Sequence, residues 1–546
     1  MSKITVYTAR RIHTMNPSMP RADAVAVRDG RIVEAGTLDT LRPWLDVHPH
    51  VVDRTFERHV LLPGFIDPHL HPPMAAVLLP LHFITAMEWR LPWGTVAPTH
   101  GADAYLARLR KIERSLADSS EPLITWGYHE IWHGPMHREA LNRISASRPV
   151  VVWQRSFHAI YANDAALRWM DLDEDTLERH PQIDAATGHF FETGLAVANA
   201  RMAPHLLDHK RFRDGLRRVR QAIHHGGHTT IADMAFALFD QEREWEALCD
   251  VLDRDDTPFR VHMVPRVKDP GSAGMESELA RVRALRELEA GRLSFHDHVK
   301  LFTDGGFFAE LMQVQPPGFI DGHHGEWLMA PERFEALARA FWNEGYRIHV
   351  HCTGDLGLEL AIEVLAKLQW ERPRFDHRFT IEHFGLSTPE QIRRLARLGG
   401  LVSANVHYVH ELADAYWRHS IGHERATRMA RLGTVVREGI PLALHSDFTM
   451  APAQPLHHAW VATNRICASG EVAGPEERLT LEQALRAITI DAAFVLGMED
   501  EIGSIRAGKR ADFTVLEADP FEEPVEALKD IPVWGTVFEG RPFAIR

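Results

Sequence analysis

The most constraining feature of this sequence is a repeated alternation of short β-branched or apolar runs with longer amphipathic segments. Helical segments with an apolar spacing of 3.6 residues follow most of the runs, for example Pro331–Glu344, Leu356–Leu368 and Pro389–Leu398. Strands that alternate with helices are typical of a parallel sheet, and eight such units predict an α/β fold of the (β/α)₈ TIM-barrel type. The eight predicted strands are Leu61–His71, Thr229–Ala235, Phe259–Pro265, His298–Gly305, Tyr346–Cys352, Phe379–Phe384, Leu401–Tyr408 and Pro441–Phe448.

The two ends of the chain have a different sequence pattern, in which short β-branched runs are separated by turns. Ala24–Gly36 reads as a hairpin with its turn at Asp29–Gly30, and Ala511–Glu517 and Val533–Arg541 are β-branched runs near the other end. Because neither end is long enough to bury a core alone, we expect one small β-sandwich made from residues 1–60 and 497–546. The barrel, residues 61–496, then lies between them. The alternative is two independent terminal extensions.

One interval interrupts the strand–helix rhythm. Residues 72–228 separate the first predicted strand from the second, whereas loops in α/β units usually have ~2–6 residues. This interval is rich in tryptophan, and it leaves from the carboxyl end of a barrel strand. We therefore predict an inserted subdomain that lies over the mouth of the barrel, where active sites of this fold are found. More of its tryptophans are expected in its own core than in a pocket.

Composition excludes several classes of protein. The 546 residues carry 61 basic and 75 acidic side chains, a net charge of −14, which argues against nucleic-acid binding. There is no apolar run of membrane-spanning length and no apolar segment at the first residues, so we expect neither a membrane anchor nor a signal peptide. The three cysteines match no disulfide framework or zinc knuckle. A soluble, cytoplasmic protein is expected.

The strongest chemical signal lies at the end of the first predicted strand. His69 and His71 are two residues apart, so their side chains share one face, which in a barrel is the interior. Two imidazoles that converge at a strand end make half of a zinc site. The alternative is a pair of buried core histidines, each of which would need a hydrogen-bond partner.

Other strand ends add candidates of the same kind. Lys300 lies inside an apolar strand, where an amine needs a compensating group unless it reaches an acid or the strand edge. His351 ends the fifth strand, with His349 on the same face one layer deeper. The remaining candidates are His383 at the end of the sixth strand, whose neighbour Glu382 is expected to face the helices, and Asp447 at the end of the eighth, with His445 on its face.

These residues carry a family resemblance that runs over nearly the whole chain. The order His-x-His, Lys, His, His and Asp on successive strands resembles the binuclear amidohydrolase superfamily. The phrases "PGFIDPHLHP", "VKLFTDG", "HCTGDLG", "IEHFGL", "HSDF" and "GSIRAGKRADFTVLEADP" are similar to its amidohydrolase-3 branch, that of the YtcJ-like proteins and N-substituted formamide deformylase. A terminal β domain and a long insertion after the first strand are also features of that branch.

The resemblance implies a metal-dependent hydrolase of carbon–nitrogen bonds other than peptide bonds, acting on a small molecule. It implies two divalent ions, most simply Zn²⁺, with Lys300 carboxylated to a carbamate that bridges them. By analogy, His69 and His71 bind the more buried ion and His351 and His383 the more exposed one. Asp447 contacts the bridging hydroxide and is the catalytic residue. A homodimer is a further expectation from homologous barrels.

Substrate contacts are expected from two places. His158 and Asn163 lie in the segment "WQRSFHAIYAND" of the insertion, which matches the family pattern only loosely. His407 and Tyr408 are at the predicted end of the seventh strand, with His407 on the inward face. For His158 and Asn163, a structural hydrogen-bonding role within the insertion is the alternative. The tryptophans of the insertion suggest an apolar or aromatic substrate.

Three other functions are compatible with such a barrel. A mononuclear-zinc deaminase would typically lack the fourth-strand lysine and carry a glutamate soon after the fifth-strand histidine, but here Lys300 is present and His351 is followed by Cys-Thr-Gly-Asp. An ester or lactone hydrolase would use the same attack chemistry on the same two ions. A non-catalytic binding module would be expected to have lost some of the six ligands, and all six are intact.

Overall fold

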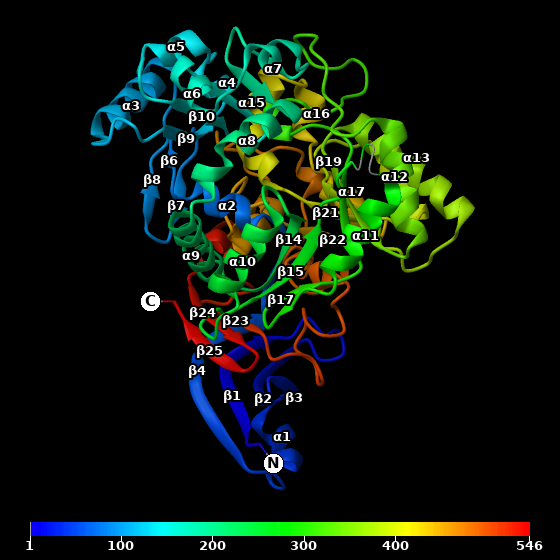
Figure 1. Cartoon of the computed structure of the whole chain (residues 1–546). Helices are drawn as coiled ribbons and strands as arrows, with labels where there is room; N and C mark the ends of the chain where they lie inside the picture. The colour runs from blue at the N-terminus through cyan, green and yellow to red at the C-terminus, as the bar shows by residue number, and fades with distance from the viewer. Residues whose placement is uncertain (1, 270, 272–273, 546) are drawn as a thin grey trace.

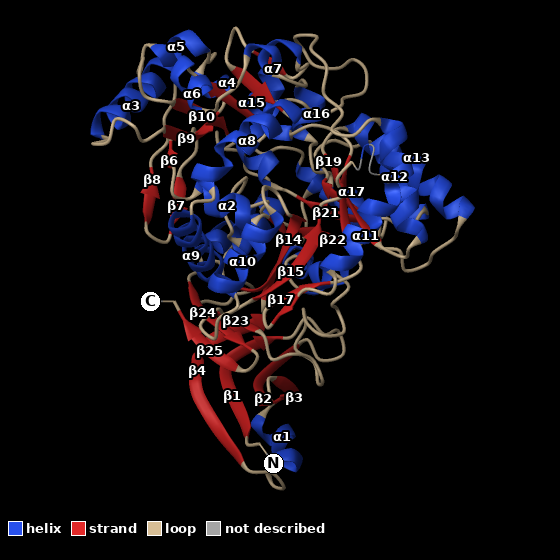
Figure 2. Ribbon diagram, viewed as in Figure 1, coloured by secondary structure: helices blue, strands red, loops and turns tan. Residues whose placement is uncertain are grey.

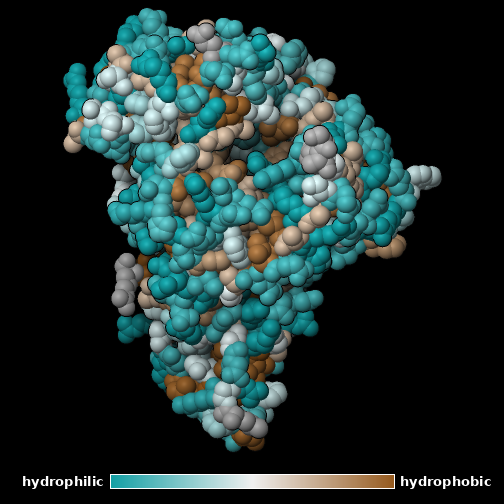
Figure 3. All heavy atoms as spheres, viewed as in Figure 1, coloured by the Kyte–Doolittle hydropathy of each residue, from teal (hydrophilic) through white to brown (hydrophobic). Residues whose placement is uncertain are grey.

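The computed structural model describes residues 2–269, 271 and 274–545. Figure 1 shows three regions arranged end to end: a sheet that contains both chain termini, a central body of strands and helices, and a cap formed largely by the helices and strands of the insertion. Within the described residues, no helix is both long and apolar enough to cross a membrane. The face in Figure 3 is mostly hydrophilic and is hollowed where the insertion meets the central body.

The central body contains eight parallel strands that correspond to the eight predicted ones. They belong to two sheets, in the orders β16-β17-β15-β14-β5 and β18-β19-β20-β21-β22, joined by a parallel bridge between Arg266 and Lys300. The first sheet also contains the short strands β16 (Glu289–Ala290) and β17 (Leu293–Phe295). The closed barrel itself stays a prediction. The eight strands are β5 (Phe65–Leu70), β14 (His228–Phe236), β15 (Arg260–Pro265), β18 (His298–Phe302), β19 (Arg347–Cys352), β20 (Thr380–His383), β21 (Leu401–Ala404) and β22 (Leu442–Leu444).

Several of the predicted strand boundaries were wrong. The fourth strand ends at Phe302 and not at Gly305, and the eighth ends at Leu444 and not at Phe448. Leu61–Pro63 belong to the preceding strand β4 (His50–Pro63) of the terminal sheet, so the first strand of the central body begins only at Phe65. The seventh strand ends at Ala404, four residues earlier than predicted, because the chain turns and starts helix α15 (His407–His419) there.

Helices cover the outer faces of the parallel strands (Figure 2). The three helices named from the sequence are present, and capping boxes at Thr388 and Thr480 satisfy backbone N–H groups at the start of α14 and α19. The helices of this region are α10 (Gln241–Leu252), α11 (Met275–Leu285), α12 (Pro331–Asn343), α13 (Asp355–Glu371), α14 (Pro389–Arg397), α15, α16 (His423–Thr427), α17 (Leu432–Arg437), α18 (Pro455–Asn464), α19 (Leu481–Ala487) and α20 (Ile490–Val495).

The two ends of the chain share one seven-stranded sheet, in the order β25-β24-β23-β4-β1-β2-β3. The C-terminal strand β23 pairs antiparallel with β4, and a buried apolar cluster with residues from both ends lies against the sheet. The structure therefore shows strands from both ends in one sheet, and the sandwich form stays a prediction. The strands besides β4 are β1 (Ile4–His13), β2 (Arg21–Arg28), β3 (Arg31–Gly36), β23 (Phe513–Leu516), β24 (Val533–Phe538) and β25 (Arg541–Ala544).

The insertion runs between β5 and β14 and contains its own sheet, in the order β12-β13-β11-β10-β9-β6. Trp89, Trp126 and Trp153 are almost fully buried in it, which agrees with the prediction that its tryptophans serve mainly its core. Its main elements are α2 (Pro72–Leu78), β6 (His82–Phe83), β7 (Trp89–Leu91), β8 (Gly94–Val96), α3 (Ala102–Ser115), β9 (Leu123–Tyr128), β10 (Val150–Gln154), β11 (Ala159–Ala162), α6 (Asp164–Trp169), β12 (Ile183–Asp184), β13 (His189–Phe191), α8 (Thr193–Leu206) and α9 (His209–His225).

Candidate metal centre

All six side chains predicted as metal ligands line one cavity at the carboxyl ends of the parallel strands. Because parallel strands end at the same edge of a sheet, residues far apart in the sequence become neighbours there. The structure brings the whole predicted set together. The six are His69 on β5, His71 directly after it, Lys300 on β18, His351 on β19, His383 as the last residue of β20, and Asp447 in the loop after β22.

Asp447 lies between three of the imidazoles. Its Oδ1 is 3.1 Å from His71 Nε2 and 3.7 Å from His69 Nε2, and its Oδ2 is 3.6 Å from His383 Nδ1. The Asp447 backbone has a φ of +53°, and its N–H donates to the carbonyl oxygen of His69 over 2.9 Å. This bond fastens the loop after β22 to the end of β5 and so holds the carboxylate among the rings.

Lys300 and His351 lie on the other side of the site. The His351 and His383 ring centroids are 4.4 Å apart. Lys300 is 1% exposed, and its Nζ has no hydrogen-bond partner among the described residues. Burial lowers the pKa of Lys300 to about 8, although Glu382 and Asp447 act in the opposite direction. A buried amine without an acceptor costs free energy, so this position requires a compensating group.

The polar atoms that face the centre fit a divalent metal ion. His69 Nε2 and His383 Nδ1 are buried without a hydrogen-bond partner in the described chain. Burial, together with Lys300 and neighbouring imidazoles, lowers the pKa values of both rings well below the usual range, which favours the neutral form that binds metal. Donor atoms lie within 4.8 Å of one another in two groups: His69, His71 and Asp447, and His69, His383 and His445. Imidazole nitrogens and carboxylate oxygens are ligands that zinc prefers.

The expected orientation of Glu382 was wrong. Its carboxylate lies inside the strand layer, 2.8 Å from His69 Nδ1 and 2.5 Å from His349 Nδ1. In the parallel register Glu382 pairs with His351, which lines the cavity, so the Glu382 side chain faces the interior. His383 has a φ of +70°, and the Phe384 N–H donates back to the carbonyl oxygen of Glu382 over 2.9 Å. This tight turn ends the alternation of the strand, so Glu382 and His383 both face the interior. A glutamate in a buried strand was the available signal, since a buried acid needs partners.

Glu382 acts on the metal centre through His69. An acceptor at Nδ1 fixes the ring so that Nε2 faces the centre, as is typical of histidines that bind metals. His445 is also oriented by a neighbour, because its Nδ1 lies 2.7 Å from the hydroxyl of Ser403 and its Nε2 has no partner in the described chain. His445 therefore adds an imidazole to the predicted set, and its position two residues before Asp447 was the signal for it.

A buried carboxylate below the site joins the first and last strand ends. Asp67 accepts hydrogen bonds from the backbone N–H of His69 (3.2 Å) and from the N–H and hydroxyl of Ser446. Burial raises the pKa of Asp67 to about 7. Ser446 directly precedes Asp447 in the chain. Because Asp67 bonds both the His69 N–H and Ser446, it fixes the distance between His69 and Asp447.

The cavity that contains the six residues has a volume of about 620 Å³, in the range of small-molecule sites. Residues of the insertion form part of its wall. Much of the lining is apolar, and no tryptophan is part of it among the described residues. The apolar lining includes Met74, Phe157, Leu195, Leu238, Phe239, Phe302, Met329 and Met450.

Of the four predicted substrate contacts, the structure places one in the cavity wall. His158 lines the cavity, its ring centroid is 5.7 Å from that of His351, and its Nδ1 is 2.8 Å from Glu192 Oε2. Burial alone would lower the pKa of His158, but the Glu192 carboxylate raises it above the usual value.

The other three lie outside the cavity lining. Asn163 is the N-cap of α6 and bonds four backbone groups, as the alternative structural role requires. His407 begins α15 instead of ending a strand, and its ring packs 4.6 Å from that of His457. Tyr408 stacks on Phe307 at 4.3 Å. Since a helix does not alternate like a strand, the inward-face argument for His407 and Tyr408 does not apply.

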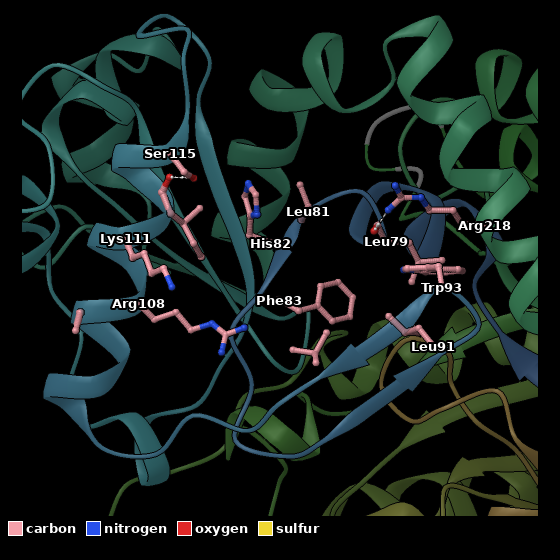
Figure 4. A pocket seen from close by; sticks show the side chains of 13 residues that line it. Leu79, Leu81, His82, Phe83, Leu91, Trp93, Arg108, Lys111, Ser115 and Arg218 are labelled. Carbon is pink, nitrogen blue, oxygen red and sulfur yellow. Dashed lines mark hydrogen bonds between the residues drawn. The ribbon is translucent and has the colours of Figure 1, made fainter.

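A second cavity, of about 730 Å³, lies within the insertion and contains none of the predicted ligands. Figure 4 shows its apolar side chains Leu81, Phe83 and Leu91, with Arg108 and Lys111 from one helix on one side and Arg218 beside Trp93 on the other. The larger of the two cavities is thus not the one with the metal-ligating residues.

The parallel strands and the ligand cluster at their ends define the class of metal-dependent hydrolases. The amidohydrolase family model, Amidohydro_3, matches residues 59–544, so this chain belongs to the amidohydrolase family. It is 25% identical over 548 residues to the putative amidohydrolase YtcJ of Bacillus subtilis (strain 168), over 97% of each chain. It is 22% identical over 572 residues to N-substituted formamide deformylase of Arthrobacter pascens, over 97% of this chain and 96% of that one.

Among solved structures, the chain is similar to an uncharacterized metal-dependent hydrolase from Pyrococcus horikoshii OT3. The TM-score is 0.72 at 20% identity, over 96% of this chain and 99% of that one. This likeness supports the fold. The resemblance to the YtcJ-like, amidohydrolase-3 branch is confirmed, and with it the prediction of a hydrolase that acts on carbon–nitrogen bonds.

Proposed function

We propose that this protein hydrolyses the carbon–nitrogen bond of an amide- or formamide-like small molecule with the help of two divalent metal ions, most simply zinc. The observation that carries the proposal is the convergence of six metal-ligating side chains from five strand ends in one cavity. The similarity to N-substituted formamide deformylase supports the bond type. The proposal includes a closed eight-stranded barrel of residues 61–496, with residues 72–228 as a lid and the terminal domain as a support.

In this proposal the ligands divide between two ions. His69 and His71 hold the more buried ion, and His351 and His383 hold the more exposed one. The buried, unpartnered amine of Lys300 supports its carboxylation. A new N–C bond forms between Nζ and carbon dioxide, and one proton is released to solvent. The resulting carbamate would be an anion whose oxygens could bind metal ions.

Asp447 is the catalytic residue of the proposal. Bound at this site, the two ions would lower the pKa of a water from 15.7 to ~7 and polarise the scissile carbonyl. Asp447 would orient the attacking water and accept its proton, because its carboxylate lies among the imidazoles of His69, His71 and His383. It then donates this proton to the leaving nitrogen. As the new C–O bond forms and the C–N bond breaks, the products are a carboxylic acid and an amine.

The test combines metal analysis with a substrate panel. Zinc-loaded protein is assayed on amides, formamides, dipeptides, esters, lactones and aminated ring compounds, and its zinc content is measured by plasma emission. We expect about two zinc ions per chain and hydrolysis of an amide or formamide. Asp447→Asn should keep metal and lower kcat by about 10²–10⁴-fold. One ion per chain with ammonia release from a ring would instead establish a deaminase, and near-wild-type turnover of Asp447→Asn would refute its role.

A further inference from the structure

Two cationic side chains line the same cavity without an acidic partner. Arg266 and Lys268 follow the end of β15, and neither side chain makes a hydrogen bond or ion pair to any residue that the structure describes. The Nε of Arg266 is buried and unpartnered. A guanidinium held in a mostly apolar wall without a counter-charge is costly, so a ligand that supplies an anion would be stabilised there.

The nearest acids are already engaged elsewhere. Glu244 is fully buried and accepts the backbone N–H groups of the loop after β14, for example that of Leu238 over 3.0 Å. Glu278 forms an ion pair with Arg281 at 2.7 Å and accepts the backbone N–H of Lys268. Neither carboxylate lies within ion-pair distance of the Arg266 or Lys268 side chains.

The third cation of this wall provides a contrast. Arg333 also lines the cavity, but its guanidinium donates two hydrogen bonds to Asp269 Oδ1, at 3.0 and 2.7 Å. Burial lowers the pKa of Lys268, and the charges of Arg281 and Arg266 lower it further, while those of Glu278 and Glu244 act in the opposite direction. The positive charge of this wall therefore comes from Arg266 and Lys268.

Arg266 is next to the metal centre in the strand order. It forms the parallel bridge with Lys300, and the N–H of Val267 donates to the carbonyl oxygen of Lys300 over 3.0 Å. Adjacent strands lie ~4.8 Å apart. An anion bound at Arg266 would thus be only a few bonds from an amide placed at the ligand cluster. The apolar lining around both, such as Phe157, Phe239 and Phe302, could hold an apolar side chain between them.

We infer that Arg266, with Lys268 beside it, binds a carboxylate of the substrate, and that the substrate class is the N-acyl or N-formyl derivative of an apolar amino acid. A guanidinium matches the two oxygens of a carboxylate in a bidentate pair. The inference rests on the proposed function for the position of the scissile bond. Beyond the proposed function, the inference specifies the carboxylate as the substrate group that the cavity binds.

The experiment is a cycle of two substrates and two enzymes. One substrate is N-acetyl- or N-formylphenylalanine, and the other is the matched amide of phenethylamine, which lacks only the carboxylate. The zinc-loaded wild type is compared with Arg266→Met, and Arg218→Met, an exposed arginine outside this cavity, serves as the control. Any direct contact between the carboxylate and the metal ions is common to all the enzymes, so it cancels in the comparison.

We expect the wild type to prefer the carboxylated substrate in kcat/KM, and Arg266→Met to reduce this preference about 10–100-fold, mainly through KM. Lys268→Met should reduce it less, Arg266→Lys should restore part of it, and Arg218→Met should not change it. Equal use of both substrates by the wild type, or a preference that persists in Arg266→Met, would overturn the inference.

Failure of the proposed function is distinguishable from failure of the inference. If the wild type hydrolyses neither substrate, the same cycle is measured as binding by calorimetry. Tighter binding of the carboxylated compound that is lost in Arg266→Met would support the anion site without amide hydrolysis. Absence of such binding would refute the inference.

Discussion

The two walls of the catalytic cavity are built on different principles. One wall consists of strand ends, and all six residues that were predicted there converge. The other wall comes from the insertion, where only one of two predicted residues, His158, faces the cavity. In the strand wall, alternation and parallel topology fix where side chains point. In the insertion, polar residues also serve its own fold, as Asn163 does, so residue type alone does not indicate function.

The largest expected effect follows from removing the central ligand of the strand wall. Lys300→Met replaces a buried amine by an apolar chain of similar length, and it cannot form the proposed carbamate. We expect the metal content to fall from about two ions per chain to one or fewer. We also expect kcat/KM to fall by at least ~10³-fold, because both ions lose a shared ligand. Plasma emission and steady-state kinetics measure the two quantities.

The matched control is Lys367→Met on the outer face of α13, where the lysine pairs with Glu335. It should leave the metal content and the kinetics unchanged. If Lys300→Met kept its metal and most of its activity, the strand ends would not form the metal site. The strand ends and the insertion would then not differ in their contribution to metal binding.

A smaller effect is expected from Glu382, which touches the ligands but not the ions. Glu382→Gln keeps the shape of the side chain, but it removes the negative charge that accepts from His69 and His349. The change should lower zinc affinity about 10–100-fold, the usual effect of losing a partner of a metal ligand. Competition with a chromophoric chelator measures this affinity.

The control for Glu382 is Glu359→Gln, since Glu359 contacts Gln391 and Arg394 at the helix surface. This variant should bind zinc like the wild type. A Glu382→Gln protein with unchanged zinc affinity but lost activity would assign Glu382 to catalysis rather than to positioning.

The orientation of Glu382 is also an example of a structural feature that was not predicted correctly from the sequence. The eight strands and the convergence of the six candidate ligands were predictable, because strand periodicity and the parallel topology leave little freedom. That His383 faces the interior together with Glu382 depends on the positive φ of His383, which the pattern of residue types does not predict. Likewise, the early end of β21 at Ala404 depends on where α15 packs, and this displaced His407 and Tyr408 from the predicted strand. The cationic pair at Arg266 required knowledge of which acids were already engaged.

A substitution in the cavity wall that comes from the insertion should lower kcat/KM less than Lys300→Met does. His158→Gln keeps a donor for Glu192 but removes the imidazole from the cavity wall. We expect kcat/KM to fall about tenfold, mostly through KM, because a single substrate contact is lost. Metal content should not change. Metal loss in this variant would break the distinction between the walls, since it would make the insertion part of the metal centre.

The smallest effect on activity is expected at Asn163, where the insertion uses a polar residue for folding alone. Its Oδ1 accepts the N–H groups of Val150 (3.0 Å) and Ala166 (2.8 Å), and its Nδ2 donates to the carbonyl oxygens of Ser145 and Arg148. Asn163→Ala should lower the free energy of unfolding by about 2–4 kcal/mol, since it loses a helix cap and leaves buried backbone groups unpaired. Its kcat/KM should equal that of the wild type.

The same substitution at a neighbouring asparagine sharpens this test. Asn142 makes a single such bond, to the N–H of Asp164 over 3.0 Å, so Asn142→Ala should cost only about 1 kcal/mol. Chemical denaturation of both variants, with kinetics measured well below the transition, separates stability from activity. If Asn163→Ala remained as stable as Asn142→Ala but lost substrate affinity, Asn163 would belong to the binding wall. The insertion would then contribute to recognition through residues that do not line the cavity.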